Sequence, residues 1–194
     1  LAAQTIYVNE PVRMLALGDS YTIGQSVAAD ERWPVQLLSR LQDEFGITDS
    51  EVDIIARTGW NTINLGFALD SQLDSSKKYN LVSLLIGVNN QFQGIDIDVY
   101  REDFAELLRE ALALVNNEPN RVFVVSIPDY AYTPSFAGST SISREIDSYN
   151  QVNRTITEGF GVPYVDITPI SRRGLLEPAL VANDGLHPSG IQYG

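Results

Sequence analysis

The chain has 194 residues, one histidine, no cysteine, and 13 Lys and Arg against 25 Asp and Glu, a formal net charge of −12. The lack of cysteine excludes disulfides, thiolate catalysis and cysteine-ligated zinc sites. An acidic surface repels phosphate groups, so neither nucleic-acid binding nor docking on anionic membranes is expected. No apolar run approaches the roughly 18 residues of a membrane span, and the length predicts one domain over residues 1–194.

The first half of the chain alternates short apolar runs with stretches of helical spacing. Apolar side chains recur at helical spacing between residues 33 and 45, and Gly46 is a suitable end for that helix. The run Leu81–Gly87 is nearly continuously apolar, as expected for a strand buried on both faces. In chain order we predict a strand at Arg13–Leu17, a helix over 33–45, a strand at Val52–Ala56, a helix around Ile63–Leu73 and a strand at Leu81–Gly87.

The second half continues the same alternation. The stretch Val99–Asn116 carries one apolar stripe with charged residues elsewhere, which predicts an amphipathic helix with Asp98 as its N-cap. Strands that alternate with helices predict an α/β domain with a mainly parallel sheet. The remaining predicted elements are a strand at Arg121–Ile127, a loop over Asp129–Ser141, a helix around Ser143–Phe160 and a short strand at Pro163–Asp166.

Polar segments follow the predicted strands directly. Right-handed crossovers place the carboxyl ends of parallel strands on one rim, where such sheets bind ligands. Ser20 at a strand end is therefore a candidate nucleophile, provided that a base and an oxyanion site lie near it. The segments that share the rim are Gly18–Tyr21, Arg57–Thr62, Gly87–Gln91 and Asp129–Tyr132.

Candidate oxyanion donors lie in the same segments. They are the backbone N–H groups of Ser20 and Gly59 and the side-chain amide of Asn89. Two of them also have a purely structural interpretation: Gly59 as a turn residue with positive φ, and Asn89 as the cap of a following helix.

His187 is the only imidazole in the chain, so histidine-based catalysis must use it. Asp184 lies three residues earlier and can turn back through Gly185 to bond the ring Nδ1, which leaves Nε2 to accept a proton. The alternative is a surface histidine in a turn.

Taken together, these blocks form a known pattern. Gly18-Asp19-Ser20, Gly59, Gly87-Val88-Asn89 and Asp184-Gly185-Leu186-His187 follow one another on successive strand ends. Over essentially the whole chain, this order resembles the SGNH subgroup of the GDSL esterase/lipase superfamily, named for its Ser, Gly, Asn and His.

The resemblance implies both a fold and a mechanism. The fold is a three-layer α/β/α flavodoxin-like domain with about five parallel strands. The activity is that of a serine esterase, in which Ser20 is the nucleophile, His187 the general base and Asp184 its orienting acid. The N–H groups of Ser20 and Gly59 and the Asn89 amide would hold the oxyanion, and no metal or cofactor is required.

The sequence departs from the family pattern in two places. The third block usually reads Gly-x-Asn-Asp, and here Asn90 stands in the last position. Asn is nearly isosteric with Asp, so we expect the loop to persist with a hydrogen bond of changed character. The sequence also stops at Gly194, where the family commonly continues into a final helix, and we expect that helix to be short or missing.

The substrate is the least determined part of the interpretation. No long insertion supplies a lid or a lipid tunnel, so we expect small esters with short acyl or acetyl groups. Carbohydrate acetyl esters, lysophospholipids and thioesters remain open, as does a flavodoxin-like or inactive carbohydrate-binding module. Six aromatic residues of the rim loops are candidates for lining an acyl pocket, stacking on a sugar or anchoring the loops: Tyr21, Trp60, Phe92, Tyr130, Tyr132 and Phe136.

Asp19 has two interpretations. A nucleophilic aspartate of the phosphatase type needs a second acid nearby for Mg²⁺, and position 21 is a tyrosine. We therefore expect Asp19 to bond loop amides beside the serine. The patterns do not report oligomeric state, and a sequence that begins at Leu1 leaves secreted, periplasmic and cytoplasmic locations open.

Overall fold

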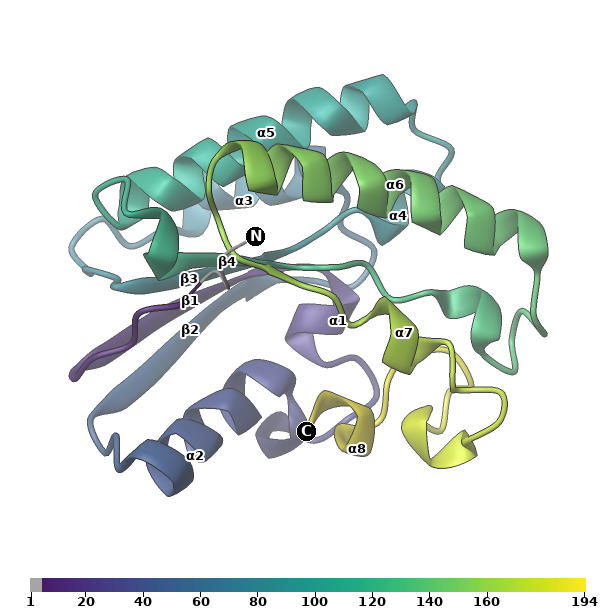
Figure 1. The fold of residues 1–194 in the computed structure, drawn as a ribbon, viewed down its shortest axis with the longest axis horizontal. Coiled ribbons are helices and arrows are strands. Elements are labelled where there is room, and N and C mark those ends of the chain that lie inside the picture. Colours follow the sequence, from purple (N-terminus) through teal and green to yellow (C-terminus); the bar gives the residue numbers. More distant parts are fainter. Residues whose placement is uncertain (1–4) are drawn as a thin grey trace.

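The computed structural model describes residues 5–194 and contains a five-stranded parallel sheet between two layers of helices (Figure 1). The strand order β2-β1-β3-β4-β5 confirms the predicted α/β class with a parallel sheet. The strands are β1 (Val12–Gly18), β2 (Ser50–Ala56), β3 (Leu81–Leu85), β4 (Val122–Val125) and β5 (Tyr164–Val165).

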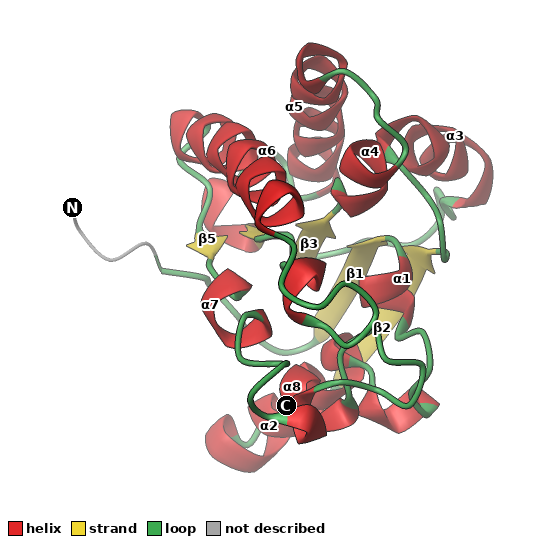
Figure 2. Ribbon diagram, turned by 90° about the vertical axis from the view of Figure 1, so that its right-hand side faces the viewer, coloured by secondary structure: helices red, strands yellow, loops and turns green. Residues whose placement is uncertain are grey.

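Eight α-helices and four 3₁₀ turns are described over residues 5–194. Helices α3, α5 and α6 cover one face of the sheet, while α2 and the short α8 lie on the other (Figures 1 and 2). The helices are α1 (Ser20–Ile23), α2 (Trp33–Phe45), α3 (Thr62–Gln72), α4 (Val88–Phe92), α5 (Ile97–Leu114), α6 (Thr140–Gly159), α7 (Thr168–Ser171) and α8 (Gly190–Tyr193).

The core follows from the apolar patterning of the central strands and of α5. All five residues of β3 are buried, and β1 is buried except at Arg13. On α5 the predicted stripe faces the sheet, with Tyr100 and Phe104 fully buried. The apolar residues of α5 recur at helical spacing and therefore form one face, which packs against the apolar sheet as in other amphipathic helices.

Several element ends differ from the predictions. The N-cap of α5 is Asp96, whose carboxylate accepts from the Asp98 amide, so the predicted cap Asp98 lies inside the first turn. Strand β3 stops before Gly87, because φ of 134° there cannot continue a strand. Helices α4 and α7 were not predicted, since four or five residues are too few to show a helical period.

A large apolar cavity of about 800 Å³ lies beside α2 and reaches the sheet. Its wall includes the side chains of Trp33, Leu37, Phe123 and Ile167, and also Tyr21 from the rim. The α8 end of the chain borders it through Gln192 and Tyr193. Over residues 5–194, no helix is both long and apolar enough to cross a bilayer.

Gly18, the last residue of β1, packs tightly against Thr22 of α1 and the backbone of β3. A Cβ atom at this position would overlap Thr22 Oγ1 and would lie 2.6 Å from the Leu85 carbonyl oxygen. No side chain can occupy that space without moving α1 or the neighbouring strand.

We therefore expect Gly18→Ala to lower the free energy of unfolding by about 1–3 kcal/mol, because the added methyl overpacks a rigid junction. Gly66→Ala is the matched control, since Gly66 lies inside α3 and an added Cβ meets no atom within 4 Å. It should raise stability by about 0.5–1 kcal/mol through helix propensity. Urea denaturation of both variants tests this, and equal midpoints for G18A and the wild type would contradict it.

Candidate active site

Ser20 is the first residue of α1 and follows β1 after a single intervening residue. It is buried, with 4% of its surface exposed. Asp19 caps this turn: its Oδ1 accepts from the Tyr21 amide at 3.0 Å, and its carbonyl oxygen accepts from Thr22 and Ile23. These bonds start α1, and with it Ser20, directly after the carboxyl end of β1, and Figure 2 shows α1 beside that end of the strand.

The carboxylate of Asp19 is fully buried, and burial raises its pKa to about 7. Oδ1 serves as the helix cap, while Oδ2 has no hydrogen-bond partner among the described residues. Within residues 5–194 there is also no cluster of His, Asp and Glu suited to a metal ion. The predicted bond from Asp19 to a backbone amide beside the serine is present, but that amide belongs to Tyr21 of α1 and not to a loop.

Asp184 and His187 form a closed turn. The Nδ1 atom of His187 lies 2.7 Å from Asp184 Oδ2, while Asp184 Oδ1 accepts from the Leu186 and His187 amides, both at 2.9 Å. Gly185 has a φ of 71°, the left-handed conformation that the turn requires. The His187 side chain is only 12% exposed, and its ring centroid lies 5.7 Å from that of Tyr21, the residue after Ser20. The histidine is therefore held by a carboxylate next to the serine segment, unlike a free surface side chain.

Ser26 is a further partner of Asp184 that the sequence did not reveal. Its hydroxyl donates to Asp184 Oδ2 at 2.6 Å, although the two residues are 158 positions apart. Partial burial acts to raise the pKa of Asp184, but bonds from Ser26, His187 and Leu186 outweigh it and hold that pKa far below its ordinary value of 3.8. The carboxylate facing the imidazole therefore stays ionised at neutral pH.

The loop after β2 and helix α4 after β3 lie against each other. Gly59 has a φ of 84°, and its carbonyl oxygen accepts from Gln93 Nε2 at 3.1 Å. Asn89 Nδ2 donates to the Trp60 carbonyl oxygen at 2.9 Å, which uses one of its two hydrogens. Asn89 lies inside α4, whose N-cap is Gly87, so its interpretation as a helix cap is wrong.

A contact also joins the Gly59 loop to the segment after Ser20. The Thr58 hydroxyl donates to Gln25 Oε1 at 2.6 Å. The structure thus brings the segments of Ser20, Gly59 and Asn89 to one rim, together with Asp184 and His187. Their catalytic roles stay a prediction.

The six aromatic candidates occupy different positions. Tyr21 and Tyr130 line a small cavity of about 10 Å³ beside His187. Phe136 and Phe92 pack against Tyr130, with ring centroids 4.7 and 6.2 Å away, and Phe92 is 62% exposed.

The remaining two aromatic candidates, Trp60 and Tyr132, are partly exposed. The Tyr132 ring lies 6.0 Å from the Arg172 guanidinium, so it packs near this arginine and does not line the cavity beside His187. Of the six aromatics, only Tyr21 and Tyr130 line the cavity next to the histidine.

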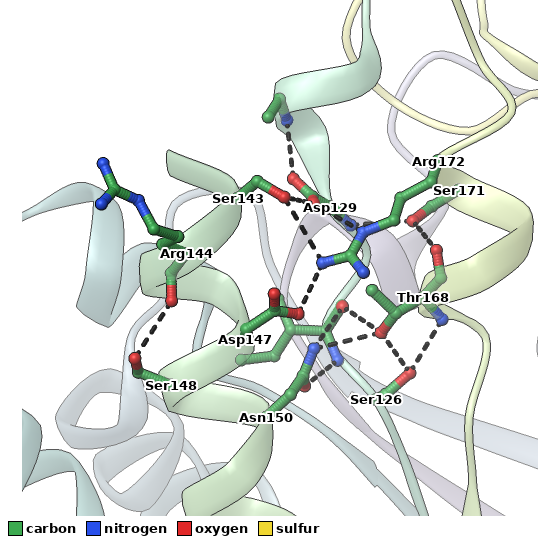
Figure 3. A network of polar contacts seen from close by, with 12 residues as sticks. Ser126, Asp129, Ser143, Arg144, Asp147, Ser148, Asn150, Thr168, Ser171 and Arg172 are labelled. Atoms are coloured by element: carbon green, nitrogen blue, oxygen red, sulfur yellow. Dashed lines mark hydrogen bonds and ion pairs between the residues drawn. The ribbon is translucent and has the colours of Figure 1, made fainter. Parts of the chain in front are cut away.

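The loop that carries Tyr130 is fixed by buried polar contacts (Figure 3). Asp129 is fully buried and accepts from Ser143 Oγ at 2.5 Å and from Arg172 Nε at 2.9 Å. Arg172 also donates to Asp147, which ties α7 to α6. A buried carboxylate with several donors is costly to disturb, so this side of the rim is rigid.

Comparisons with known proteins agree with this architecture. The model of the GDSL-like Lipase/Acylhydrolase family matches residues 16–193. No curated protein sequence gives a significant match.

Several solved structures share the fold. Axe2, an acetylxylan esterase from Geobacillus stearothermophilus, is 21% identical with a TM-score of 0.73, over 94% of this chain and 89% of that one. TesA is 19% identical with a TM-score of 0.71, over 93% and 91%. The psychrotrophic esterase EstA from Pseudoalteromonas sp. is 18% identical with a TM-score of 0.70, over 93% and 90%.

The lowered pKa of Asp184 predicts how stability depends on pH. As pH falls, the unfolded chain takes up the proton of this group first, because the folded pKa lies below 3.8. The stabilising contribution of the carboxylate should be complete above about pH 5 and lost progressively below about pH 4. Asp184→Asn should therefore be less stable than the wild type at pH 7 and should lose less between pH 5 and 2.

Melting temperatures of both proteins from pH 2 to 7 measure this difference. Asp43→Asn, on the exposed surface of α2, controls for the loss of one negative charge. Parallel curves for the wild type and D184N would contradict the assignment.

Proposed function

The chain belongs to the GDSL-like lipase/acylhydrolase family and hydrolyses ester bonds, and we propose that it acts on small carboxylic esters of short acyl groups through Ser20, His187 and Asp184. The observation that carries the proposal is the 2.7 Å contact between Asp184 and His187 Nδ1, made on the rim that holds Ser20. An ionised carboxylate on Nδ1 fixes the tautomer in which Nε2 accepts a proton.

The reaction is a two-step acyl transfer. As Ser20 Oγ bonds to the ester carbonyl carbon, its proton passes to His187 Nε2 and the carbonyl electron pair moves onto oxygen. Collapse of this intermediate breaks the bond to the leaving alcohol, which takes the proton from His187. Water then attacks the acyl-enzyme in the same way, and the carboxylic acid and free Ser20 are released.

The oxyanion would be held by the N–H groups of Ser20 and Gly59 and by the Asn89 amide. The bond from Gln93 Nε2 to the Gly59 carbonyl oxygen supports this role, because it holds the loop that carries the Gly59 N–H against α4. The contact between Asn89 and the Trp60 carbonyl supports it as well, since it fixes the amide plane before substrate arrives. Donors that are already oriented need no reorganisation when charge develops.

The packing of Tyr21 supports short acyl groups, because this buried side chain separates the space beside His187 from the larger apolar cavity. The cavity lined by Tyr21, Tyr130 and His187 measures about 10 Å³. The much larger apolar cavity of about 800 Å³ lies behind Tyr21, which lines both and is 3% exposed. Tyr21 would therefore act as a wall between the reacting centre and a volume large enough for a long acyl chain.

That larger cavity gives a second candidate function. If the Tyr21 side chain moves aside, a long acyl chain of a lysophospholipid or thioester could enter the larger apolar cavity. Acetylated carbohydrate is the third option, since the structurally similar Axe2 is an acetylxylan esterase. All three use the same proposed catalytic residues and differ in what the rim must accommodate.

We expect Ser20→Ala to lose nearly all turnover of 4-nitrophenyl acetate, and Asn89→Ala to lose about 10²–10³-fold in kcat, the usual cost of one oxyanion donor. Ser83→Ala is the matched control, because Ser83 is a buried serine of β3 whose hydroxyl has no partner among the described residues. A phosphonate ester should label the wild type at Ser20 and abolish turnover. Wild-type rates in S20A would sink the mechanism.

A series of 4-nitrophenyl esters from acetate to octanoate should show kcat/KM falling as the acyl chain lengthens, with acetylated xylo-oligosaccharides assayed beside them. Tyr21→Leu should shift the preference toward longer chains by opening the wall. Tyr193→Leu is the control, because Tyr193 borders only the larger cavity. A wild-type preference for octanoate would reverse the assignment in favour of the long-chain candidate.

A further inference from the structure

Asn90 is fully buried in α4 and takes part in a directional chain of hydrogen bonds. Its Oδ1 accepts from the Thr62 backbone N–H at 3.1 Å, and its Nδ2 lies 2.7 Å from Thr62 Oγ1. The Thr62 hydroxyl in turn lies 2.7 Å from Oδ2 of Asp103, on α5. Three elements, α3, α4 and α5, are thereby joined through one hydroxyl group.

The direction of every bond in this chain is fixed by the Thr62 backbone N–H. That group can only donate, so the atom of Asn90 that faces it must be the carbonyl oxygen. The amide nitrogen of Asn90 then faces the Thr62 hydroxyl and donates to it. The hydroxyl has one proton, and because its oxygen accepts from Asn90 Nδ2, it donates that proton to Asp103 Oδ2.

An aspartate at position 90 would reverse the direction of the hydrogen bond between that residue and the Thr62 hydroxyl. Both of its oxygens would accept, one from the Thr62 amide and one from the Thr62 hydroxyl. The hydroxyl could no longer donate to Asp103, and two carboxylates would compete for a single proton beside a buried group. The side chain at residue 103 thus decides which residue position 90 tolerates.

We propose that Asp103 is a positioning residue whose carboxylate orients the Thr62 hydroxyl and makes asparagine the required residue at position 90, so that Asn89 and the Gly59 loop are aligned for catalysis. The inference rests on the proposed function, because it assigns the aligned groups to the oxyanion site. Residue 90 is covalently next to Asn89, and Thr62 is the first residue of α3, directly after the loop that carries Gly59. Loss or reversal of one of these hydrogen bonds would therefore displace both proposed donors, the Asn89 amide and the Gly59 N–H, together.

Neighbouring contacts explain why the hydrogen bonds through Thr62 affect the position of the proposed oxyanion donors and not only that of α3. Gln93, one turn beyond Asn89, donates to the Gly59 carbonyl and accepts from Asn61 Nδ2 at 2.8 Å. The segments 59–62 and 89–93 are thus paired by side-chain amides along their length. Amide pairs specify direction as well as distance, so one reversed bond alters the alignment of the others.

The test is a double-mutant cycle in the full chain, read as kcat and KM for 4-nitrophenyl acetate. Asn90→Asp should lower kcat by about tenfold or more, with KM little changed, since the donors it displaces act on the transition state. Asp103→Asn should stay within about threefold of the wild type, because an amide oxygen can still accept the hydroxyl proton. The N90D/D103N double variant should recover to within about threefold of the wild type, because the new amide at position 103 can donate to the hydroxyl and the whole chain reverses.

Matched variants separate this device from a general loss of structure. Glu102→Gln removes an exposed charge next to Asp103 and should not rescue N90D. Thr62→Ser keeps the hydroxyl and should preserve both the activity and the coupling between positions 90 and 103. Thr62→Val removes it, and in that background the effects of N90D and D103N on melting temperature should become additive.

Failure of the inference and failure of the proposed function give different results. If the wild type is active and the double variant is no better than the product of the two single effects, the positioning role of Asp103 is overturned while the esterase function stands. If the wild type hydrolyses no ester, the proposed function is wrong. The hydrogen bonds from Asn90 through Thr62 to Asp103 are then tested by the melting temperatures of the same variants. Recovery of N90D stability by D103N then supports the hydrogen-bond chain, and additive losses overturn it.

Discussion

The register of the parallel sheet at Gly18 is the constraint on which the candidate site depends. Gly18 pairs with Ala56 of β2 on one side and with Leu85 of β3 on the other, so three adjacent strands end level with one another. Ser20, Gly59 and Asn89 follow these ends by two to four residues. A shift of one residue in either pairing would move a donor by about 3.3 Å, which is more than a hydrogen bond tolerates.

Beyond the strand ends, hydrogen bonds with a fixed direction define the site more than apolar packing does. The Asp184 carboxylate accepts from the Ser26 hydroxyl, from His187 and from the turn amides, and this set of donors keeps it ionised next to the imidazole. Asp129, which lines the same small cavity as His187, is held similarly by Ser143 and Arg172 (Figure 3). In both places a carboxylate anchors a loop that carries a candidate substrate-contacting or catalytic group. Such anchors specify orientation, which burial of apolar surface alone cannot do.

The sequence was informative where the signal is local. Alternating strands and helices predicted the fold class, and the spacing from Asp184 to His187 predicted their contact, because three residues and a glycine suffice to close that turn. It was uninformative where partners are far apart: nothing near Ser26 indicates that it faces Asp184. The changed residue at Asn90 was visible in the sequence, but its meaning was not, because the Asp103 carboxylate that decides it lies on α5. Such contacts depend on how loops and helices meet after folding, so distance along the chain set the limit of prediction.

Two glycines of the sequence motifs have a consequence for how relatives of this chain are recognised. Gly18 and Gly87 have no room for a Cβ atom, since one at Gly87 would lie 2.7 Å from the Tyr100 ring. These two glycines are therefore required by the packing of α1 and α5 against the sheet. We expect them to be retained even in a relative that has lost catalytic activity. Ser20 and His187 carry no comparable steric requirement. A motif search weighted toward the glycines will collect inactive and active members alike, and only the hydroxyl and imidazole positions can sort them.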